Sequence, residues 1–534
     1  MEKLVSLCKR RGFIFQSSEI YGGINGFWDY GPLGAELKRN IKEYWWRAMT
    51  QLRDDIAGLD ASIIMHPKIW EASGHTTTFT DEMVDCLLTQ KRFRADQIEP
   101  LSGDAYFWTG ARDEKTGKES TDAYSVIISP KKHADYARKA ARLFYQQRGA
   151  AEPALLGERM EHLENTTRYN PENGSLLTEP RKFNLMLKTY VGPVQSEDNV
   201  AYLRPETAQA IFAQFKTIQE VARQKVPFGI CQIGKAFRNE INPRNFTFRS
   251  REFEQMELEF FIRPDEVVEK LAGSVARFTE GMDLSQPQPN WGWEVWHRYW
   301  LKQRLDWYYA IGLPVEALSC YWQSREKNEL AHYAKACVDI LFKFPFGTQE
   351  LEGIAARGDF DLTQHQKFSG KSMEYFDEEA KAKYVPHVIE PSAGVDRLLL
   401  ALVSHAYNEE EAPDEKGKME MRVVMKFHPR IAPIKVAVFP LLKNRPELVQ
   451  KALAVRDLLR PHMSVFYDEA GAIGRRYRRQ DEAGTPFGIT IDFDTLGEKG
   501  DELKDTVTLR DRDTMQQVRI KIPDLVPALR EKIR

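Results

Sequence analysis

The sequence predicts an α+β protein of more than one domain: an antiparallel sheet with helices and an insertion, followed by a C-terminal α/β domain. Length is the first observation, because 534 residues exceed a single hydrophobic core and favour two to four domains. The second is strand-like alternation between residues 181 and 265. The third is the regular exchange of strands and helices after Pro433.

Composition narrows the class of protein without indicating a function. The net charge of −2 and the pI of about 6.6 give no general basic field, so any polyanion site must come from local clustering. The five cysteines are scattered and contain no CxxC pair, which excludes a disulfide framework and a zinc ribbon. Lys and Arg interrupt the apolar residues of segment 1–16, and no apolar run reaches membrane-spanning length. We therefore expect a cytoplasmic protein with no membrane partner.

The first 180 residues predict a short mixed segment and then an insertion. The Gly-rich stretch Gly22–Gly34 indicates a loop or hairpin, and apolar residues at helical spacing predict a helix from Ala35 to about Asp54. Residues 61–67 predict a short strand that ends at Pro67. From about Thr80 the chain becomes more charged and includes a basic helix, which favours an inserted subdomain. A long helical extension of the core is the alternative.

The remaining residues predict the rest of the sheet and the last domain. Helices are expected near 266–282 and 293–311 and over Gly394–Tyr407, strands near 341–346, 350–356 and 386–390, and a polar linker over 409–422. After Pro433 come a buried strand, a helix, a strand, a basic helix-like run, another strand and a hairpin. The predicted boundaries give the first part of a main domain (1–80), the insertion (81–180), the second part of the main domain (181–430) and a C-terminal domain (431–534).

The most informative stretch is "FRNEINPRNFTFRSREFEQMELEF", residues 237–260. Strand alternation places Phe253, Gln255, Glu257 and Glu259 on one face, with several arginines nearby. A solvated face with compensating ion pairs is the ordinary explanation for such a run. However, an aromatic ring lies among the charges, and arginine rather than lysine is used, which suits phosphate contact and ring stacking. The combination indicates a nucleotide with a bound divalent ion.

Several motifs in order resemble a known family. Residues 237–240 and 248–253 resemble motif 2 of class II aminoacyl-tRNA synthetases, "EPSAGVDRLLLAL" (390–402) resembles motif 3, and "LDASIIMHP" (59–67) resembles motif 1. The segments "WDYGPLG", "SGH", "RFRAD", "YLRPETAQAIF", "AHYAKA" and "ELEGIAARGDFDL" are similar to the homodimeric type of glycyl-tRNA synthetase. The resemblance covers nearly the whole chain.

The resemblance implies a two-step reaction in a homodimer. The glycine carboxylate attacks the α-phosphorus of ATP, and the glycyl group then passes to the 3′ end of the tRNA for glycine. Neither step needs a protein nucleophile, because positioning and neutralisation of phosphate charge supply the catalysis. ATP with Mg²⁺, glycine and this tRNA are the implied ligands. No zinc is expected. Some relatives carry a CxxC pair at this point, whereas here Cys86 is followed three residues later by Thr89.

The resemblance also assigns site residues. Catalytic roles fall to Arg238 at the α-phosphate, Glu240 at the adenine edge and Arg397 at the far side of the nucleotide. Glu350 is the expected Mg²⁺ ligand. The ATP-binding set is Arg238, Asn239, Glu240, Phe248, Arg249, Ser250, Arg251, Glu252, Phe253, Glu350, Leu351, Gly394, Val395, Asp396 and Arg397.

Glycine has no side chain to grip, so selection must come from excluding larger amino acids and binding the ammonium and carboxylate groups. A pocket walled by carboxylates does both. The glycine-binding set is Arg94, Glu206, Phe253, Glu254, Gln255, Met256, Glu257, Glu390, Pro391, Ser392, Ala393 and Gly394. His75 follows a glycine in a turn and is left out of catalysis.

The last domain resembles the anticodon-binding domain shared by one subclass of these enzymes. The run "GRRYRRQD" (474–481) interleaves a tyrosine with four arginines, which suits phosphates and a stacked base, although a solvated basic helix face explains it almost as well. For the insertion we expect contact with the acceptor arm of the tRNA.

Two other functions stay open at this point. One is a synthetase of the same subclass for proline, threonine or histidine. The other is a non-catalytic class II-like protein, such as a polymerase accessory subunit or an RNA-binding paralogue. Such a protein should lose the phosphate-binding arginines, and Arg238 and Arg397 are both present.

Overall fold

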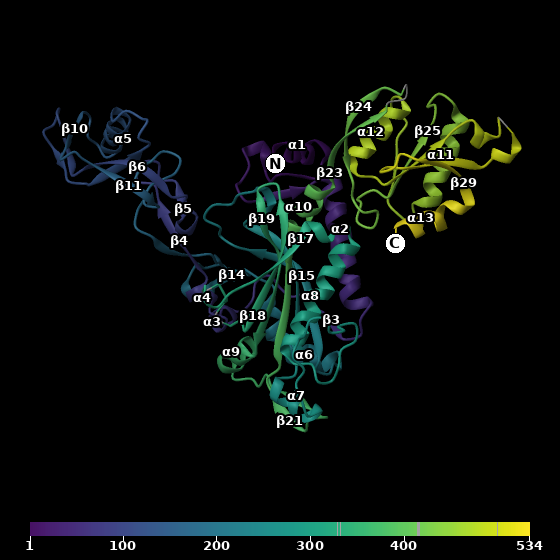
Figure 1. Ribbon diagram of the computed structural model, residues 1–534, viewed down its shortest axis with the longest axis horizontal. Helices are drawn as coiled ribbons and strands as arrows, with labels where there is room; N and C mark the ends of the chain where they lie inside the picture. Colours follow the sequence, from purple (N-terminus) through teal and green to yellow (C-terminus); the bar gives the residue numbers. More distant parts are fainter. Residues whose placement is uncertain (328, 332, 414–416, 499, 534) are drawn as a thin grey trace. The chain divides into compact units, whose positions relative to one another are not determined.

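The computed structural model describes residues 1–534 except 328, 332, 414–416, 499 and 534. These residues form two compact units (Figure 1). The larger contains Met1–Ser73, Lys188–Phe237 and Arg244–Arg534, and the smaller contains Gly74–Leu187 and Arg238–Pro243. Within the described residues, no helix combines the length and the apolar character needed to cross a membrane.

A seven-stranded sheet forms the centre of the larger unit (Figure 1). Its spatial order is β17 (Leu318–Trp322), β18 (Ala336–Phe344), β19 (Gly347–Gly358), β22 (His387–Gly394), β16 (Glu252–Ile262), β15 (Phe228–Phe237) and β3 (Ile56–Gly58). Neighbouring strands are antiparallel except β15 and β3, which are parallel. The predicted antiparallel sheet is therefore confirmed.

One face of this sheet is closed by apolar packing. Alternation along β16 places Met256, Leu258 and Phe260 on this face, where all three are fully buried. Phe260 packs on Trp296 and Trp300 at ring-centroid distances of 5.1 and 5.0 Å. The helices that contribute to this core are α2 (Pro32–Trp46), α8 (Trp293–Ala310) and α10 (Val395–Ala406).

The opposite face carries apolar packing at one end. Phe261 and Ile230 pack there with side chains of α6 (Ala208–Val221) and α9 (Phe360–Ser369). Further along the same face of β16, the next side chains are Glu259 and Glu257. The sheet thus changes from an apolar to an acidic surface within three residues.

Three local predictions are wrong in whole or in part. The helix expected near 266–282 is only α7 (Asp265–Ala272), because Gly273 adopts the left-handed conformation that ends it. Residues 61–67 form no strand, because buried Arg204 donates hydrogen bonds to the Ala61 and Ser62 carbonyls (3.0 and 3.5 Å) in place of a neighbouring strand. The polar stretch 409–422 is not a linker: β23 (Tyr407–Pro413) pairs with β24 (Met419–Met425), and residues 414–416 between them lie outside the described part.

The C-terminal residues form the predicted α/β arrangement. Its sheet has the order β26 (Val465–Tyr467), β25 (Val436–Pro440), β27 (Phe487–Ile491), β28 (Thr506–Asp511) and β29 (Gln517–Lys521). β26, β25 and β27 are parallel to one another, β28 is antiparallel to β27, and β29 is antiparallel to β28. Helices α11 (Pro446–Leu459) and α13 (Leu525–Ile533) contribute to its core, and α12 (Ile473–Ala483) carries the arginine-rich run.

The smaller unit consists mainly of short strands rather than a helical extension. Its three-stranded sheets are β12 (Arg181–Asn184), β4 (Thr80–Asp85) and β5 (Arg92–Arg94); β11 (Arg159–Thr166), β6 (Leu101–Trp108) and β9 (Tyr124–Ile128); and β10 (Pro153–Leu156), β7 (Gly110–Asp113) and β8 (Glu119–Ser120). The predicted basic helix is present as α5 (Asp135–Gln146), and it packs on this core through Ala137, Ala141 and Phe144.

Candidate active site

The acidic end of the sheet surface lies beside a cavity of about 340 Å³. Residues lining it include Tyr333, Asp339, Glu350, Gly353, Glu390 and Ser392. They come from three adjacent strands, β18, β19 and β22, and from the segment before β18. Register explains why they converge: Gly353 of β19 pairs with Asp339 on one side and with Ser392 on the other, which in turn pairs with Glu257.

Glu257 is fixed by four donors. The backbone and hydroxyl of Thr207 donate to one carboxylate oxygen, the backbone at 3.0 Å. Gln255 and Ser392 donate to the other oxygen at 2.8 and 2.6 Å. A carboxylate held by four donors keeps one orientation.

Glu390 belongs to a buried ion network on the same face. The Arg357 guanidinium donates to both Glu390 oxygens at 2.8 and 2.9 Å and to both Asp361 oxygens at 2.8 and 2.9 Å. The Tyr333 ring lies 3.9 Å from the guanidinium carbon of Arg357. Burial raises the pKa of Glu390 to about 7, although the Arg357 charge opposes this.

Glu259 is the least satisfied group of the network. The register that pairs Glu257 with Ser392 and Phe260 with Ile389 places Glu259 opposite Glu390. Its side chain is fully buried, and both carboxylate oxygens lack a hydrogen-bond partner among the described residues. Burial, reinforced by the Glu390 charge, raises the pKa of Glu259 well above its usual range.

Arg397 and Glu350 meet at the other side of the cavity. Their side chains form an ion pair of 3.3 Å, and Arg397 also donates to the Glu350 and Phe248 carbonyls at 3.4 and 3.3 Å. The guanidinium lies 4.6 Å from the centre of the Phe248 ring. Arg397 occupies the first turn of α10, as predicted, where the helix N-terminus favours an anion. Three residues of the predicted ATP set are thus together.

The same region has donors that fit a magnesium ion. A Cβ added to Gly353 would lie 3.7 Å from a Glu350 oxygen and 3.8 Å from an Asp339 oxygen, so both carboxylates border the same open space. Mg²⁺ binds hard oxygens and commonly uses only one or two protein carboxylates with substrate phosphates. In the described parts of the chain, no group of three His, Cys, Asp or Glu is arranged as a protein-only metal site.

Several predicted site residues do not present their side chains to this cavity. Glu254 and Met256 point to the opposite face, because strand side chains alternate; Glu254 binds Lys38 and Lys42 at 2.9 and 2.8 Å, and Met256 is in the core. Asp396 accepts from Lys38 at 2.7 Å, from Tyr30 and from the Glu254 backbone. The same correction applies to the side chains of Leu351, Ala393 and Val395, which are buried in the core.

The loop and strand of motif 2 place their remaining residues in the larger unit. Arg251 donates to the Asn25 carbonyl at 2.8 Å, Glu252 pairs with Lys235, and the Ser250 hydroxyl donates to the Thr247 carbonyl at 3.3 Å. Arg249, Phe253 and Gln255 lie along the same run, with Phe253 partly exposed on the face that carries Glu257. Pro391, between Glu390 and Ser392, is buried.

Arg238, Asn239 and Glu240 belong to the smaller unit together with Arg94. Arg238 lies 5.4 Å from the centre of the Phe79 ring, and the Asn239 backbone donates to the Leu185 carbonyl at 2.8 Å. Arg94 forms ion pairs with Asp81 and Asp96 at 2.7 and 2.8 Å. Although burial opposes the effect, these carboxylates and Glu240 raise the pKa of Arg94.

Sequence reasoning missed the residues that hold the pocket rather than line it. They are Arg204, Thr207, Gln209, Arg357 and Asp361, all buried. Arg204 and Thr207 flank the predicted Glu206, and Arg357 and Asp361 lie in the quoted "ELEGIAARGDFDL" segment. Charged residues inside otherwise apolar segments were the available signal, since such residues are buried only when they are paired.

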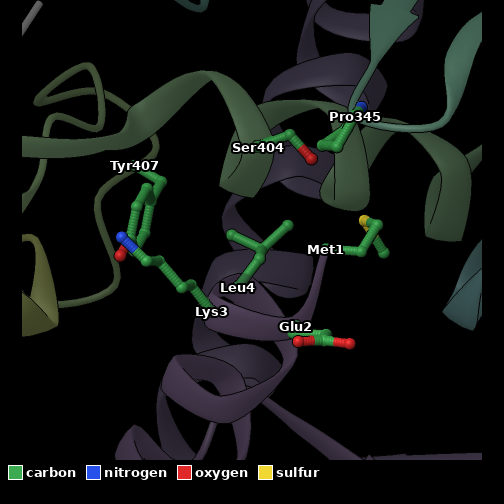
Figure 2. A pocket seen from close by; sticks show the side chains of 7 residues that line it. All are labelled: Met1, Glu2, Lys3, Leu4, Pro345, Ser404 and Tyr407. Carbon is green, nitrogen blue, oxygen red and sulfur yellow. The ribbon is translucent and has the colours of Figure 1, made fainter.

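A second cavity of about 560 Å³ has a different character (Figure 2). It is lined by Met1 to Leu4 of the N-terminal segment, which includes the start of α1 (Glu2–Arg11), and by Pro345, Ser404 and Tyr407. It contains one lysine, one glutamate and mostly apolar atoms, so it lacks the paired arginines and carboxylates that a nucleotide with a metal ion requires.

In the C-terminal domain, the arginine-rich helix uses part of its charge internally. Arg476 is buried and donates to the carbonyls of Pro440 and Leu441 at 2.6 and 3.2 Å. Tyr477 packs edge-on against Phe439 and shares a 2.6 Å hydrogen bond with the Thr490 hydroxyl. Arg475 and Arg478 instead line a cavity of about 540 Å³ together with one side of Tyr477.

Comparisons with known proteins agree with this architecture. Residues 190–283 match the family described as the tRNA synthetase class II core domain (G, H, P, S and T), and residues 435–532 match the family described as the anticodon binding domain. Glycine–tRNA ligases from Thermus thermophilus and Thermobifida fusca are each 46% identical to the chain over all of its length and 99% and 98% of theirs. The glycine–tRNA ligase of Rhodopirellula baltica is 43% identical over 100% of this chain and 99% of its own. The chain therefore belongs to the glycine–tRNA ligase family, with a class II synthetase core and a C-terminal anticodon-binding domain.

Proposed function

We propose that the protein is a glycine–tRNA ligase that uses ATP to form glycyl-adenylate and then transfers glycine to the 3′ end of its tRNA. The single observation that carries this proposal is the sheet face on which the buried Arg357–Glu390 pair adjoins Glu257 and the Arg397–Glu350 pair. One part of this surface suits a small ammonium compound and the other suits phosphates. Full-length similarity to glycine–tRNA ligases supports the same assignment.

The carboxylates account for selection of glycine. Glu257 is held by four donors and both oxygens of Glu390 by the Arg357 guanidinium, so both carboxylates can face an ammonium group without rearranging. The proposal requires a pocket around them that has room for a hydrogen but not for a larger substituent at the α-carbon. A steric wall of this kind rejects larger amino acids without a second, editing site. By the resemblance, Glu206, Ser392 and Arg94 complete the binding of glycine.

The arginines account for activation. By the resemblance, Arg238 neutralises the α-phosphate while the glycine carboxylate attacks it, Glu240 and Asn239 read the adenine edge, and Phe253 stacks on the ring. Arg397 is held by Glu350 and Phe248 in an orientation that suits the far phosphate. When bound, Mg²⁺ would neutralise charge on the phosphates, with Glu350 and Asp339 as the residues that would hold it.

The C-terminal domain is proposed to bind the anticodon and the smaller unit the acceptor arm. Arg475, Arg478 and the exposed side of Tyr477 suit phosphates and a base. Removal of residues 434–534 should spare adenylate formation but weaken tRNA charging. Unchanged charging by the truncated protein would contradict this part of the proposal. The four-domain division of the chain stays a proposal of the same standing.

We also propose a homodimer. Ile20 and Tyr21 are 88% and 87% exposed, and Ile24 is 52% exposed on the same short loop. Contiguous apolar side chains on a surface commonly mark a contact with another protein. A second copy of the chain is the partner that the resemblance implies, and sedimentation of the purified protein tests it directly.

One assay tests the proposed activity. Purified protein, ATP, Mg²⁺ and a panel of amino acids are measured for amino-acid-dependent pyrophosphate exchange, and glycine is then tested for transfer to tRNA. We expect exchange with glycine alone. Exchange with proline, threonine or histidine would indicate a different specificity, and absence of any ATP binding would indicate a non-catalytic relative.

A further inference from the structure

Gln209 is the buried residue that connects the two sides of the carboxylate pocket. It is the second residue of α6, and its side chain has no exposed surface. Its amide nitrogen lies 3.0 Å from a Glu206 oxygen and 3.0 Å from an Asp361 oxygen. Its amide oxygen lies 2.9 Å from Nε2 of His365.

The chemistry of these partners fixes the orientation of the amide. Carboxylates only accept hydrogen bonds, so the NH₂ group must face Glu206 and Asp361, with one hydrogen for each. The amide oxygen then faces His365, whose Nε2 must donate. Burial lowers the pKa of His365, although Asp361 opposes this, so the ring is neutral with its proton on Nε2.

The two carboxylates that share Gln209 belong to different parts of the pocket. Glu206 is itself a proposed contact of glycine. Asp361 contacts no substrate but binds Arg357, which in turn holds Glu390 at 2.8 and 2.9 Å. One amide group therefore links α6 to α9 and, through Arg357, to strand β22.

We propose that Gln209 is a positioning residue for glycine, which sets the spacing between the Glu206 and Glu390 carboxylates by bridging Glu206 and Asp361. This inference rests on the proposed glycine pocket. Without the bridge, the half-buried Glu206 and the buried Asp361 each lose a hydrogen bond and repel each other. Both can then move apart, which loosens the grip on the ammonium group and widens the space at the α-carbon.

The test compares Gln209→Leu with the unchanged protein in glycine-dependent pyrophosphate exchange. Hydrogen bonds to charged groups contribute enough that loss of two should raise the KM for glycine about 10-fold or more. The KM for ATP and the kcat per titrated active site should change less than about 3-fold, because the Arg397 side of the cavity is untouched. The preference for glycine over alanine should fall, because the pocket is wider.

Two further variants separate positioning from folding. Gln209→Glu keeps the oxygen for His365 and, when protonated, one donor; its glycine KM relative to the unchanged protein should therefore lie closer to normal at pH 6 than at pH 8. His365→Ala frees the amide to rotate and should raise the glycine KM by a smaller factor. Gln480→Leu is the matched control, since Gln480 is a buried glutamine of α12 that accepts a hydrogen bond from Thr485 at 2.6 Å.

The outcomes are distinguishable. A raised glycine KM with weakened discrimination against alanine, absent from the control, supports the proposal. A lower fraction of active sites with unchanged KM and unchanged discrimination overturns it, because a purely structural role predicts only that. Should the unchanged protein fail to use glycine at all, the proposed function itself fails, independently of any Gln209 variant.

Discussion

Two buried groups of charged side chains in the larger unit differ in how completely their charges are matched. At the proposed glycine pocket, one guanidinium, Arg357, binds two carboxylates, Glu390 and Asp361, and two further acidic side chains, Glu257 and Glu259, lie on the same sheet face. We propose that the ammonium group of glycine binds here as a further cation, so the charges of this group are matched only when the substrate is bound.

The second group lies where β24 meets the C-terminal domain and is internally complete. Arg422 binds Asp481 at 2.9 Å and also Glu410, and Arg510 binds the other Asp481 oxygen at 3.0 Å. Arg512 donates to the carbonyls of Phe427 and Gly484 at 2.9 Å each. The comparison indicates that a buried group with excess charge can bind a ligand, whereas a buried group whose charges pair with one another stabilises the fold.

Removing a carboxylate from the proposed glycine pocket should have the largest effect on activity. We expect Glu390→Ala to abolish glycine activation, because the ammonium loses a carboxylate partner and Arg357, left with Asp361 alone, places less well compensated positive charge near it. ATP binding should persist, since Arg397 and Glu350 are unchanged. Pyrophosphate exchange and nucleotide binding measure the two effects, and normal glycine-dependent exchange by the variant would refute the role of Glu390.

Breaking the ion pairs around Asp481 should instead lower the stability of the fold. Asp481→Asn leaves Arg422 and Arg510 buried without their common carboxylate, which should lower the free energy of unfolding by about 3 kcal/mol. Glycine-dependent exchange at a temperature where the variant stays folded should be unchanged. Chemical denaturation checks the first expectation; a variant as stable as the parent would show that the junction is not held by this carboxylate.

The pocket group also shows which residues sequence reasoning can name, those within motifs, and which it misses, those that support them. Glu257, Glu390, Glu350 and Arg397 were predicted because each lies within a recognisable motif, and the structure places all four on one unit around one sheet face. Met256 was included only because it is adjacent in the chain. Strand alternation, which was already visible, would have excluded it.

Arg357 and Asp361 could not be assigned from the sequence. Their partners, Glu390 and Gln209, are 33 and 152 residues away in the chain, and only the folded register brings them together. The hairpin over 409–422 failed for a related reason. Its charged residues are typical of a solvated linker, and only the structure shows that Arg422 is buried against Asp481. Long-range pairing of charges is the information that local patterns lack.

The pH dependence of the glycine KM tests the charge of the proposed pocket. Because the pKa of Glu390 is raised to about 7, the residue is increasingly protonated below that pH and loses the charge that attracts ammonium. The KM for glycine should therefore fall about tenfold per unit as pH rises from 5 toward 7, and then level off. Steady-state exchange at saturating ATP measures this. A glycine KM that is flat across this range would contradict a titrating carboxylate in the pocket.

The smallest effect is expected at Glu259, and its sign is opposite to that at Asp481. A carboxyl whose pKa is raised by folding binds its proton more tightly in the folded state, so stability is lost as pH rises above the ordinary glutamate range. Glu259→Gln removes this penalty and should raise the Tm by about 2 °C at pH 8, with a smaller gain at pH 5. Scanning calorimetry at both pH values is the measurement, and a lower Tm at pH 8 would argue against a buried, uncharged acid.

The bonds that Arg512 makes to the Phe427 carbonyl also bear on the order in which the protein is assembled during translation. The catalytic sheet can form once its last strand has left the ribosome, yet Arg422 of β24 and Phe427 beyond it wait for partners encoded 59 and 85 residues later. A nascent chain therefore exposes the polar groups at the end of β24 until its final strands emerge. During this interval, chaperones and neighbouring chains can compete for these groups.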